Sequence, residues 1–340
     1  MPSPNSWLLV DVMDPRRPTV VAVGARAKSR VALRTFIRES DRDVVLAAVT
    51  RAVRSTDPVR VASGSRQVSV DPIKDDESGV VYGVWVQVAH RSAEPTGRPS
   101  AWAFHWDLNA GIARRSAIVS ESQSWAQLGV DLVRPIPDGL AKLDLGDATA
   151  SVLARLVSGG TGTVLQEIGI ERRPSGLHRK IQFTAHFYGD PAHDTEHSGR
   201  FIRGVSVDLG PSNNPEHSDR DAANMGELVA QSLCDPNEYR AIADPDSLRL
   251  LYWYGDSPSD IAWQTDHLAD GKPVLHPGDR KNARASAQAL LTAPLGATQA
   301  LSLRLLTNAD EYASVPVTAR AIDLADDSRA ILWILRPQTA

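Results

Sequence analysis

The sequence predicts an α+β protein made of three consecutive modules with mainly antiparallel sheets. The chain has 340 residues, which is longer than one hydrophobic core usually serves. Its 22 prolines and 23 glycines suit many turns between short strands. One order of elements, two strands followed by a helical connector and three more strands, occurs three times with little sequence identity between the copies.

The first module is predicted over residues 1–97. Two apolar runs indicate a hairpin over residues 7–12 and 19–23. A helix is expected from Ser40, because Ser40 and Asp43 have the spacing of a capping box. The helix should end at Pro58, and apolar residues at helical spacing would form its buried face: Val45, Ala48, Val49, Ala52 and Val53. Three strands should follow over residues 59–62, 67–70 and 80–89.

The middle module is predicted over residues 98–212. Its first strand, 101–108, places Trp102, Phe104 and Trp106 on one face, because side chains alternate along a strand. We interpret these aromatic side chains as core or inter-domain packing. Asp147 is the expected cap of a helix over about 148–157. The remaining strands are expected over residues 112–119, 163–172, 178–188 and 201–209.

A polar linker with a connector helix is predicted over residues 213–245, and a C-terminal domain over residues 246–340. Asp279 is the expected N-cap of a helix over 280–292, which Pro294 would stop. The expected strands of this domain cover residues 248–254, 300–306, 312–324 and 330–335.

The C-terminal module resembles a PAS domain. The resemblance is carried by the segment 276–280 (HPGDR) before a helix, and by an arginine-bearing strand around Arg304 followed by two more strands. Residues 201–208 (FIRGVSVD) resemble the closing strand of such a domain in the middle module. The whole chain is similar to three-domain actinobacterial PAS-like proteins of the mycobacterial type. This resemblance implies five-stranded antiparallel sheets with helices on one face, and a role in small-molecule sensing or protein association.

Trp253 and Trp263 are the candidate residues of a ligand pocket, because they lie where the resemblance implies a cavity. Indole offers a large apolar surface and one hydrogen-bond donor. Plain core packing is the alternative reading of both residues. The sequence does not identify a ligand or cofactor.

A metal site is considered and not expected. Histidines and aspartates gather in one glycine- and proline-containing loop, but loop spacing does not guarantee a shared ligand face. These residues are His186, Asp190, His193, Asp194 and His197. A flavin-reactive thiol at Cys234 is disfavoured, because no matching motif is present. His267 lies in about the right region for a haem ligand, but a surface or polar-network histidine is favoured.

The expected function is a non-enzymatic sensory or regulatory role, exerted through a small molecule, a protein partner or both. No nucleophile elbow or phosphate-binding loop is present. The net charge of −4 argues against a nucleic-acid partner. The absence of a long apolar run argues against a membrane span, and the single cysteine favours a reducing, cytoplasmic location. A ligand-free scaffold and a metal-dependent enzyme are the alternatives.

Overall fold

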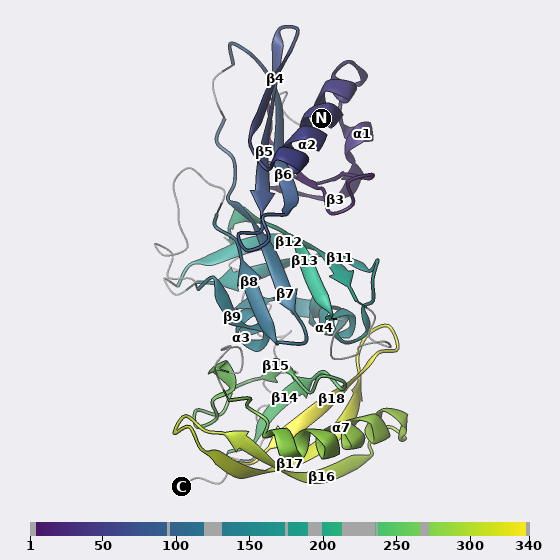
Figure 1. The fold of residues 1–340 in the computed structure, drawn as a ribbon, viewed down its shortest axis with the longest axis vertical. Coiled ribbons are helices and arrows are strands. Elements are labelled where there is room, and N and C mark those ends of the chain that lie inside the picture. Colours follow the sequence, from purple (N-terminus) through teal and green to yellow (C-terminus); the bar gives the residue numbers. More distant parts are fainter. Residues whose placement is uncertain are drawn as a thin grey trace.

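Three antiparallel sheets are stacked along the long axis of the molecule (Figure 1). The computed structural model describes residues 5–93, 96–118, 131–173, 176–189, 199–212, 235, 237–265 and 272–337. Within these ranges, no helix has both the length and the apolar composition needed to cross a membrane.

The N-terminal sheet has six strands in the order β3-β2-β1-β6-β5-β4. The predicted hairpin is present as an antiparallel pair of β1 and β2. The strands are β1 (Leu8–Asp11), β2 (Thr19–Val23), β3 (Arg26–Ala32), β4 (Val59–Ser63), β5 (Arg66–Lys74) and β6 (Val81–His90). The edge strand β3 was not predicted, because its arginines and lysine leave it mostly exposed and without a buried face.

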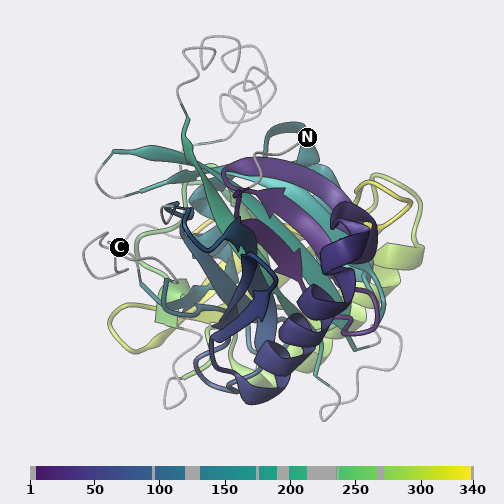
Figure 2. The ribbon, with the colours of Figure 1, turned by 90° about the horizontal axis from the view of Figure 1, so that it is seen from above.

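Helix α2 (Glu39–Ser55) covers one face of this sheet and follows the short helix α1 (Leu33–Phe36) (Figure 2). The predicted apolar face is buried at Val45, Ala48, Val49 and Ala52. The predicted capping box is wrong. The helix begins one residue before Ser40, its N-cap is Arg38, and no side chain bonds to the cap.

The middle sheet has seven strands in the order β10-β11-β12-β13-β7-β8-β9. Its strands are β7 (Ala101–Asp107), β8 (Ile112–Arg115), β9 (Val133–Pro135), β10 (Leu143–Asp144), β11 (Val164–Arg172), β12 (His178–Tyr188) and β13 (Phe201–Pro211). The segment between β9 and β10 forms α3 (Ile136–Ala141), and α4 (Thr149–Ser158) follows a 3-10 turn. Asp147 lies in that turn and does not cap α4, whose N-cap is Ala148 without a side-chain bond.

The C-terminal sheet has five strands in the order β15-β14-β18-β17-β16. They are β14 (Tyr239–Ala243), β15 (Leu250–Tyr254), β16 (Thr298–Leu306), β17 (Tyr312–Asp323) and β18 (Arg329–Leu335). The central strand β14 lies in the segment that we expected to be a linker. Helix α7 (Pro277–Thr292) is capped by His276, whose Nδ1 accepts from the backbone N–H of Gly278 at 3.0 Å.

Asp279 therefore does not cap α7. It lies inside the first turn and forms an ion pair with Arg304 on β16, at 2.7 Å between Oδ1 and a guanidinium nitrogen. Hydrogen bonds from Arg304 hold the pKa of the Asp279 carboxyl below its usual value. The aspartate thus ties the start of the helix to the sheet, because a charge pair joins the two elements.

The three sheets share one arrangement of strands. In each, the first strand of the module is a central neighbour of the last strand, as β1 is of β6, β7 of β13 and β14 of β18. The N-terminal and middle sheets differ from the expected five strands only by added edge strands, β3 in one and β9 and β10 in the other. The repetition predicted from the order of elements is therefore also a repetition in space.

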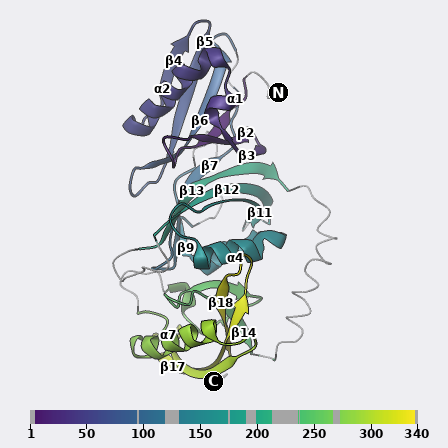
Figure 3. The ribbon, with the colours of Figure 1, turned by 90° about the vertical axis from the view of Figure 1, so that its right-hand side faces the viewer.

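The modules pack into consecutive layers, helix, sheet, sheet, helices, sheet and helix (Figure 3). The face of the N-terminal sheet opposite α2 meets the middle sheet through residues such as Leu9, Trp85, Ala103 and Val205. The approach is close, because a Cβ on Gly83 would lie 2.9 Å from Cγ2 of Val205. On the other side of the middle sheet, α3 and α4 lie against the C-terminal sheet.

Buried charges join the layers. Nε2 of His186 on β12 lies 2.7 Å from Oδ2 of Asp11 on β1, between the N-terminal and middle sheets. Arg200 is 2 % exposed and pairs with Asp244 at 3.0 Å. Its other terminal nitrogen donates to the carbonyls of Leu156 and Val157 at the end of α4, at 2.7 and 2.9 Å. Arg200 thus connects the last turn of α4 to the C-terminal module.

Candidate functional site

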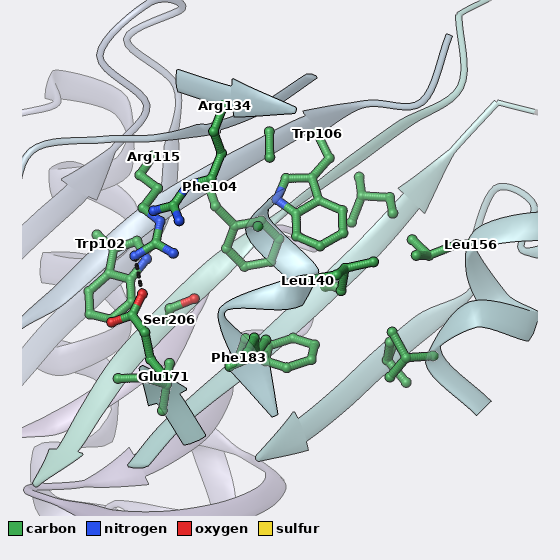
Figure 4. A pocket seen from close by; sticks show the side chains of 18 of the residues that line it. Trp102, Phe104, Trp106, Arg115, Arg134, Leu140, Leu156, Glu171, Phe183 and Ser206 are labelled. Atoms are coloured by element: carbon green, nitrogen blue, oxygen red, sulfur yellow. Dashed lines mark hydrogen bonds and ion pairs between the residues drawn. The ribbon is translucent and has the colours of Figure 1, made fainter. Parts of the chain in front are cut away.

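A pocket lies in the middle module, between the sheet face and helices α3 and α4 (Figure 4). Its volume is about 70 Å³, which is room for several water molecules or a small organic group. Leu140 from α3 and Val152 and Leu156 from α4 form the helical wall. The pocket therefore lies between the sheet and the two helices.

The opposite wall is aromatic. Trp102, Phe104 and Trp106 of β7 all line the pocket, as their predicted common face requires. Phe104 packs edge-on against Phe183, with ring centroids 6.5 Å apart. Gly204 on the neighbouring strand makes this possible, because a Cβ there would lie 2.6 Å from the Phe104 ring. We interpreted these aromatic residues as packing, and they do belong to hydrophobic clusters, while the same side chains also line the pocket.

One end of the pocket is polar and contains a carboxylate that is paired with two arginines. Glu171 of β11 is 4 % exposed and accepts hydrogen bonds from Arg115 of β8 and, at 3.2 Å, from Arg173. Burial alone would raise the pKa of Glu171, but the two arginines hold it below its usual value. The Arg115 guanidinium also lies over the ring of Trp102, 5.8 Å from its centroid. Glu171 is therefore ionised and fully engaged, which makes it a poor general base.

Arg134 of β9 is the second arginine at this end. Figure 4 shows its side chain and that of Arg115 converging above Trp102 and Phe104. Arg134 is 5 % exposed, and burial, followed by the nearby charge of Arg115, lowers its pKa to about 10. The side chain is therefore still cationic at neutral pH, although little solvent reaches it.

The predicted pocket residues Trp253 and Trp263 lie elsewhere, in the core of the C-terminal module. Their rings meet edge to face with centroids 5.7 Å apart. They line a second, smaller cavity of about 40 Å³. Nε1 of Trp253 is buried without a hydrogen-bond partner in the part of the chain that the structure describes. The structure brings the two tryptophans together in the hydrophobic core of this module.

A single segment separates the two cavities. Arg134, Gly139 and Leu140 line the pocket of the middle module. Pro135 and Pro137, from the same stretch of β9 and α3, line the smaller cavity next to the tryptophans. The segment 133–141 is therefore a common wall.

Of the candidate ligands in the histidine-rich loop, the structure describes His186 alone. His186 is engaged by Asp11 on the far side of the middle sheet. Asp190, His193, Asp194 and His197 lie outside the described residues, as do His267 and Cys234. Within the described ranges, no three His, Cys, Asp or Glu side chains are grouped as metal ligands.

Models of known protein families match two regions of the chain, one in its first third and one in its last third. A model of the Rv3651-like N-terminal domain matches residues 6–96, and a model of the Rv3651-like C-terminal domain matches residues 224–340. The two matches together take up more than half of the sequence. The chain belongs to the Rv3651-like family. The pocket of the middle module lies between the two matched regions.

One solved structure supports the fold of this Rv3651-like chain. A crystal structure of a protein from Mycobacterium tuberculosis is 24 % identical with a TM-score of 0.79, over 98 % of this chain and 96 % of that one. An RNA-binding light-oxygen-voltage receptor is 13 % identical with a TM-score of 0.22, over 70 % of this chain and 95 % of that one.

A third match is the periplasmic sensory domain of the Campylobacter jejuni chemoreceptor Tlp1. It is 9 % identical with a TM-score of 0.15, over 60 % of this chain and 72 % of that one. A comparison with curated proteins gives no match. The mycobacterial structure therefore carries the structural likeness, which concerns the fold alone.

Proposed function

We propose that this Rv3651-like chain is a non-enzymatic regulatory protein that binds a small molecule in the middle module. The observation that carries the proposal is the pocket with an aromatic wall and two arginines at one end. Largely apolar pockets with a few convergent polar groups are the usual form of small-molecule sites. A buried group with a perturbed pKa, here Arg134, is a further mark of such sites.

The lining supports binding over catalysis. Its ionisable groups among the described residues are Arg115, Arg134 and Glu171. Arginine side chains do not release a proton in proteins, and the charge of Glu171 is compensated by two ion pairs, so none of the three groups is suited to proton transfer. The site can therefore hold and orient a molecule.

We also propose that the three modules are PAS-like. Each contains five antiparallel strands in the same spatial order, with at least one helix packed on the sheet. The resemblance is carried by the segment 276–280 at the start of α7 and by the strand that contains Arg304. An ion pair between Asp279 and Arg304 joins these two elements. On this reading, a signal leaves through contact with a protein partner.

The test is to find out what the purified full-length protein carries. We expect mass spectrometry of a denatured extract, beside a native mass, to find a small molecule at about one per chain. Ala185 is 3 % exposed and lines the pocket from β12, so Ala185→Leu should fill the space and abolish co-purification. Ala289→Leu, on the exposed face of α7, is the matched control and should retain the molecule.

Two results would count against the proposal. One is a wild-type chain that is free of any molecule and shows no change in melting temperature with a panel of small ligands. The other is a bound molecule that Ala185→Leu retains at full occupancy while the variant remains folded. The first result would favour the ligand-free scaffold, and the second would move the site elsewhere.

A further inference from the structure

The charged side chains that line the polar end of the pocket sum to a positive charge. Two arginines, Arg115 and Arg134, face one carboxylate, Glu171, so the lining groups sum to +2 − 1 = +1. Both oxygens of Glu171 are already used, one by Arg115 and the other by Arg173. Each oxygen of Glu171 thus accepts from an arginine other than Arg134.

Arg134 has only long contacts with acceptors among the described residues. One terminal nitrogen lies 3.5 Å from the carbonyl oxygen of Asp131, and the other lies 3.8 Å from Oδ2 of Asp138. That carboxylate oxygen is already bound by Nζ of Lys142 at 2.8 Å. Hydrogen bonds between such groups are usually about 2.7–3.2 Å long. A buried guanidinium with five donors is therefore left without a close acceptor while it lines an internal space.

Burying a charge without a close partner is unfavourable. An anion bound next to Arg134 would compensate this buried charge. We propose that the pocket binds a small organic monocarboxylate, with the carboxylate on Arg134 and the apolar body against Trp102, Phe104 and Trp106. The inference rests on the proposed function and specifies its ligand. A single negative charge matches the excess of +1, and the planar guanidinium fits a carboxylate through two parallel hydrogen bonds.

The walls and the volume limit the rest of the molecule. Beyond the polar end, the pocket is bounded by aromatic and aliphatic side chains, which favour a hydrocarbon chain or ring over a polar body. The volume of about 70 Å³ favours a short chain or one ring. A dianionic phosphate ester would bring more charge than the site can neutralise.

The experiment compares acids with neutral amides of the same shape. Hexanoate and benzoate are titrated into the full-length protein by calorimetry, next to hexanamide and benzamide. Each acid should bind the wild type about tenfold or more tightly than its amide, because the acid alone gains a charge-assisted pair with Arg134. In Arg134→Met, which keeps an apolar stem, the advantage of the acids should disappear.

Arg172→Gln is the matched control, because its side chain is 57 % exposed on the same strand as Glu171 and does not line the pocket. It should retain the full preference for acids. If Arg134→Met does not fold, Arg134→Lys replaces it and should weaken acid binding while the amides bind unchanged.

The possible failures can be told apart. If acids and amides bind equally to the wild type, the anion inference is overturned and the small-molecule function stands. If Arg134→Met retains the preference, Arg134 is not the anion-binding group. If none of the four probes binds and the purified chain carries no molecule, the proposed function falls as well.

Discussion

The middle and C-terminal modules have the same strand order but use the space beside the sheet differently. In the C-terminal module, Trp253 and Trp263 fill the interior and leave a cavity of about 40 Å³. In the middle module, the aromatic side chains stand along one wall, and about 70 Å³ stays open next to Arg115 and Arg134. The difference indicates that side-chain volume decides whether the space beside the sheet is filled or stays open.

The largest effect is expected when a buried tryptophan of the C-terminal module is replaced by a small residue. Trp253→Ala should lower the free energy of unfolding by about 3–5 kcal/mol, because a buried indole is replaced by a cavity. Trp106→Ala is the counterpart in the middle module. Its side chain is half-buried and borders an existing space, so a smaller loss is expected. Chemical denaturation of both variants measures the difference, and equal losses would contradict the contrast between the modules.

The next largest loss of stability is expected when Arg200, which connects the middle and C-terminal modules, is replaced. Arg200→Met should cost about 3 kcal/mol, because Asp244 would remain buried without its partner and the end of α4 would lose two donors. Arg155→Met removes an exposed pair with Asp326 at the same interface and should cost less than about 1 kcal/mol. Thermal unfolding of the two variants separates them, and a similar shift in both would show that the Arg200 pair contributes no more than a surface pair.

The charged end of the pocket gives a pH dependence. The pKa of Glu171 is lowered in the folded chain, so its ion pairs stabilise the fold above its unfolded pKa, and this contribution is lost as the pH falls through the folded pKa. Glu171→Gln should therefore flatten the loss of stability between neutral and acidic pH. Glu167 on the same strand has a pKa raised by burial, so Glu167→Gln should make the loss steeper. Denaturation across this pH range checks both signs.

The smallest effect is expected at Arg134 in the absence of ligand. Arg134→Met should change the free energy of unfolding by no more than about 1 kcal/mol, or should stabilise the chain, because it removes a buried charge that has only long contacts. A loss above about 3 kcal/mol, the size expected when a well-paired buried ion is removed, would mean that Arg134 is satisfied within the chain. Urea denaturation of the ligand-free protein measures it.

Much of the architecture could be predicted from the sequence. Alternation placed Trp102, Phe104 and Trp106 on one face, and helical spacing identified the buried face of α2. The elements that were missed lack such periodicity. Strand β3 is mostly exposed, β9 and β10 are very short, and β14 was assigned to a polar linker. The predicted helix caps were wrong. Ser40 and Asp279 lie inside their helices, and Asp147 lies in the turn before α4.

The candidate site was not predicted as a site. Its aromatic wall was identified, but the space beside it depends on how far α3 and α4 lie from the sheet, which residue spacing does not encode. Arg134 lies in a three-residue strand between Val133 and Pro135, where nothing in the pattern indicates burial. The nearest sequence signal is an arginine that follows an apolar pair and precedes a proline, and that signal alone does not distinguish a pocket from an exposed turn.

The common wall formed by residues 133–141 has a thermodynamic consequence. Any displacement of this segment changes the shape of both cavities, because Leu140 faces one and Pro137 faces the other. An occupant of the pocket that favours one position of the segment would then alter binding at the tryptophan cavity or on the C-terminal sheet beside it. Reciprocity requires the opposite effect to be equal in free energy, so a partner held by the C-terminal module would tune the affinity of the pocket by the same factor.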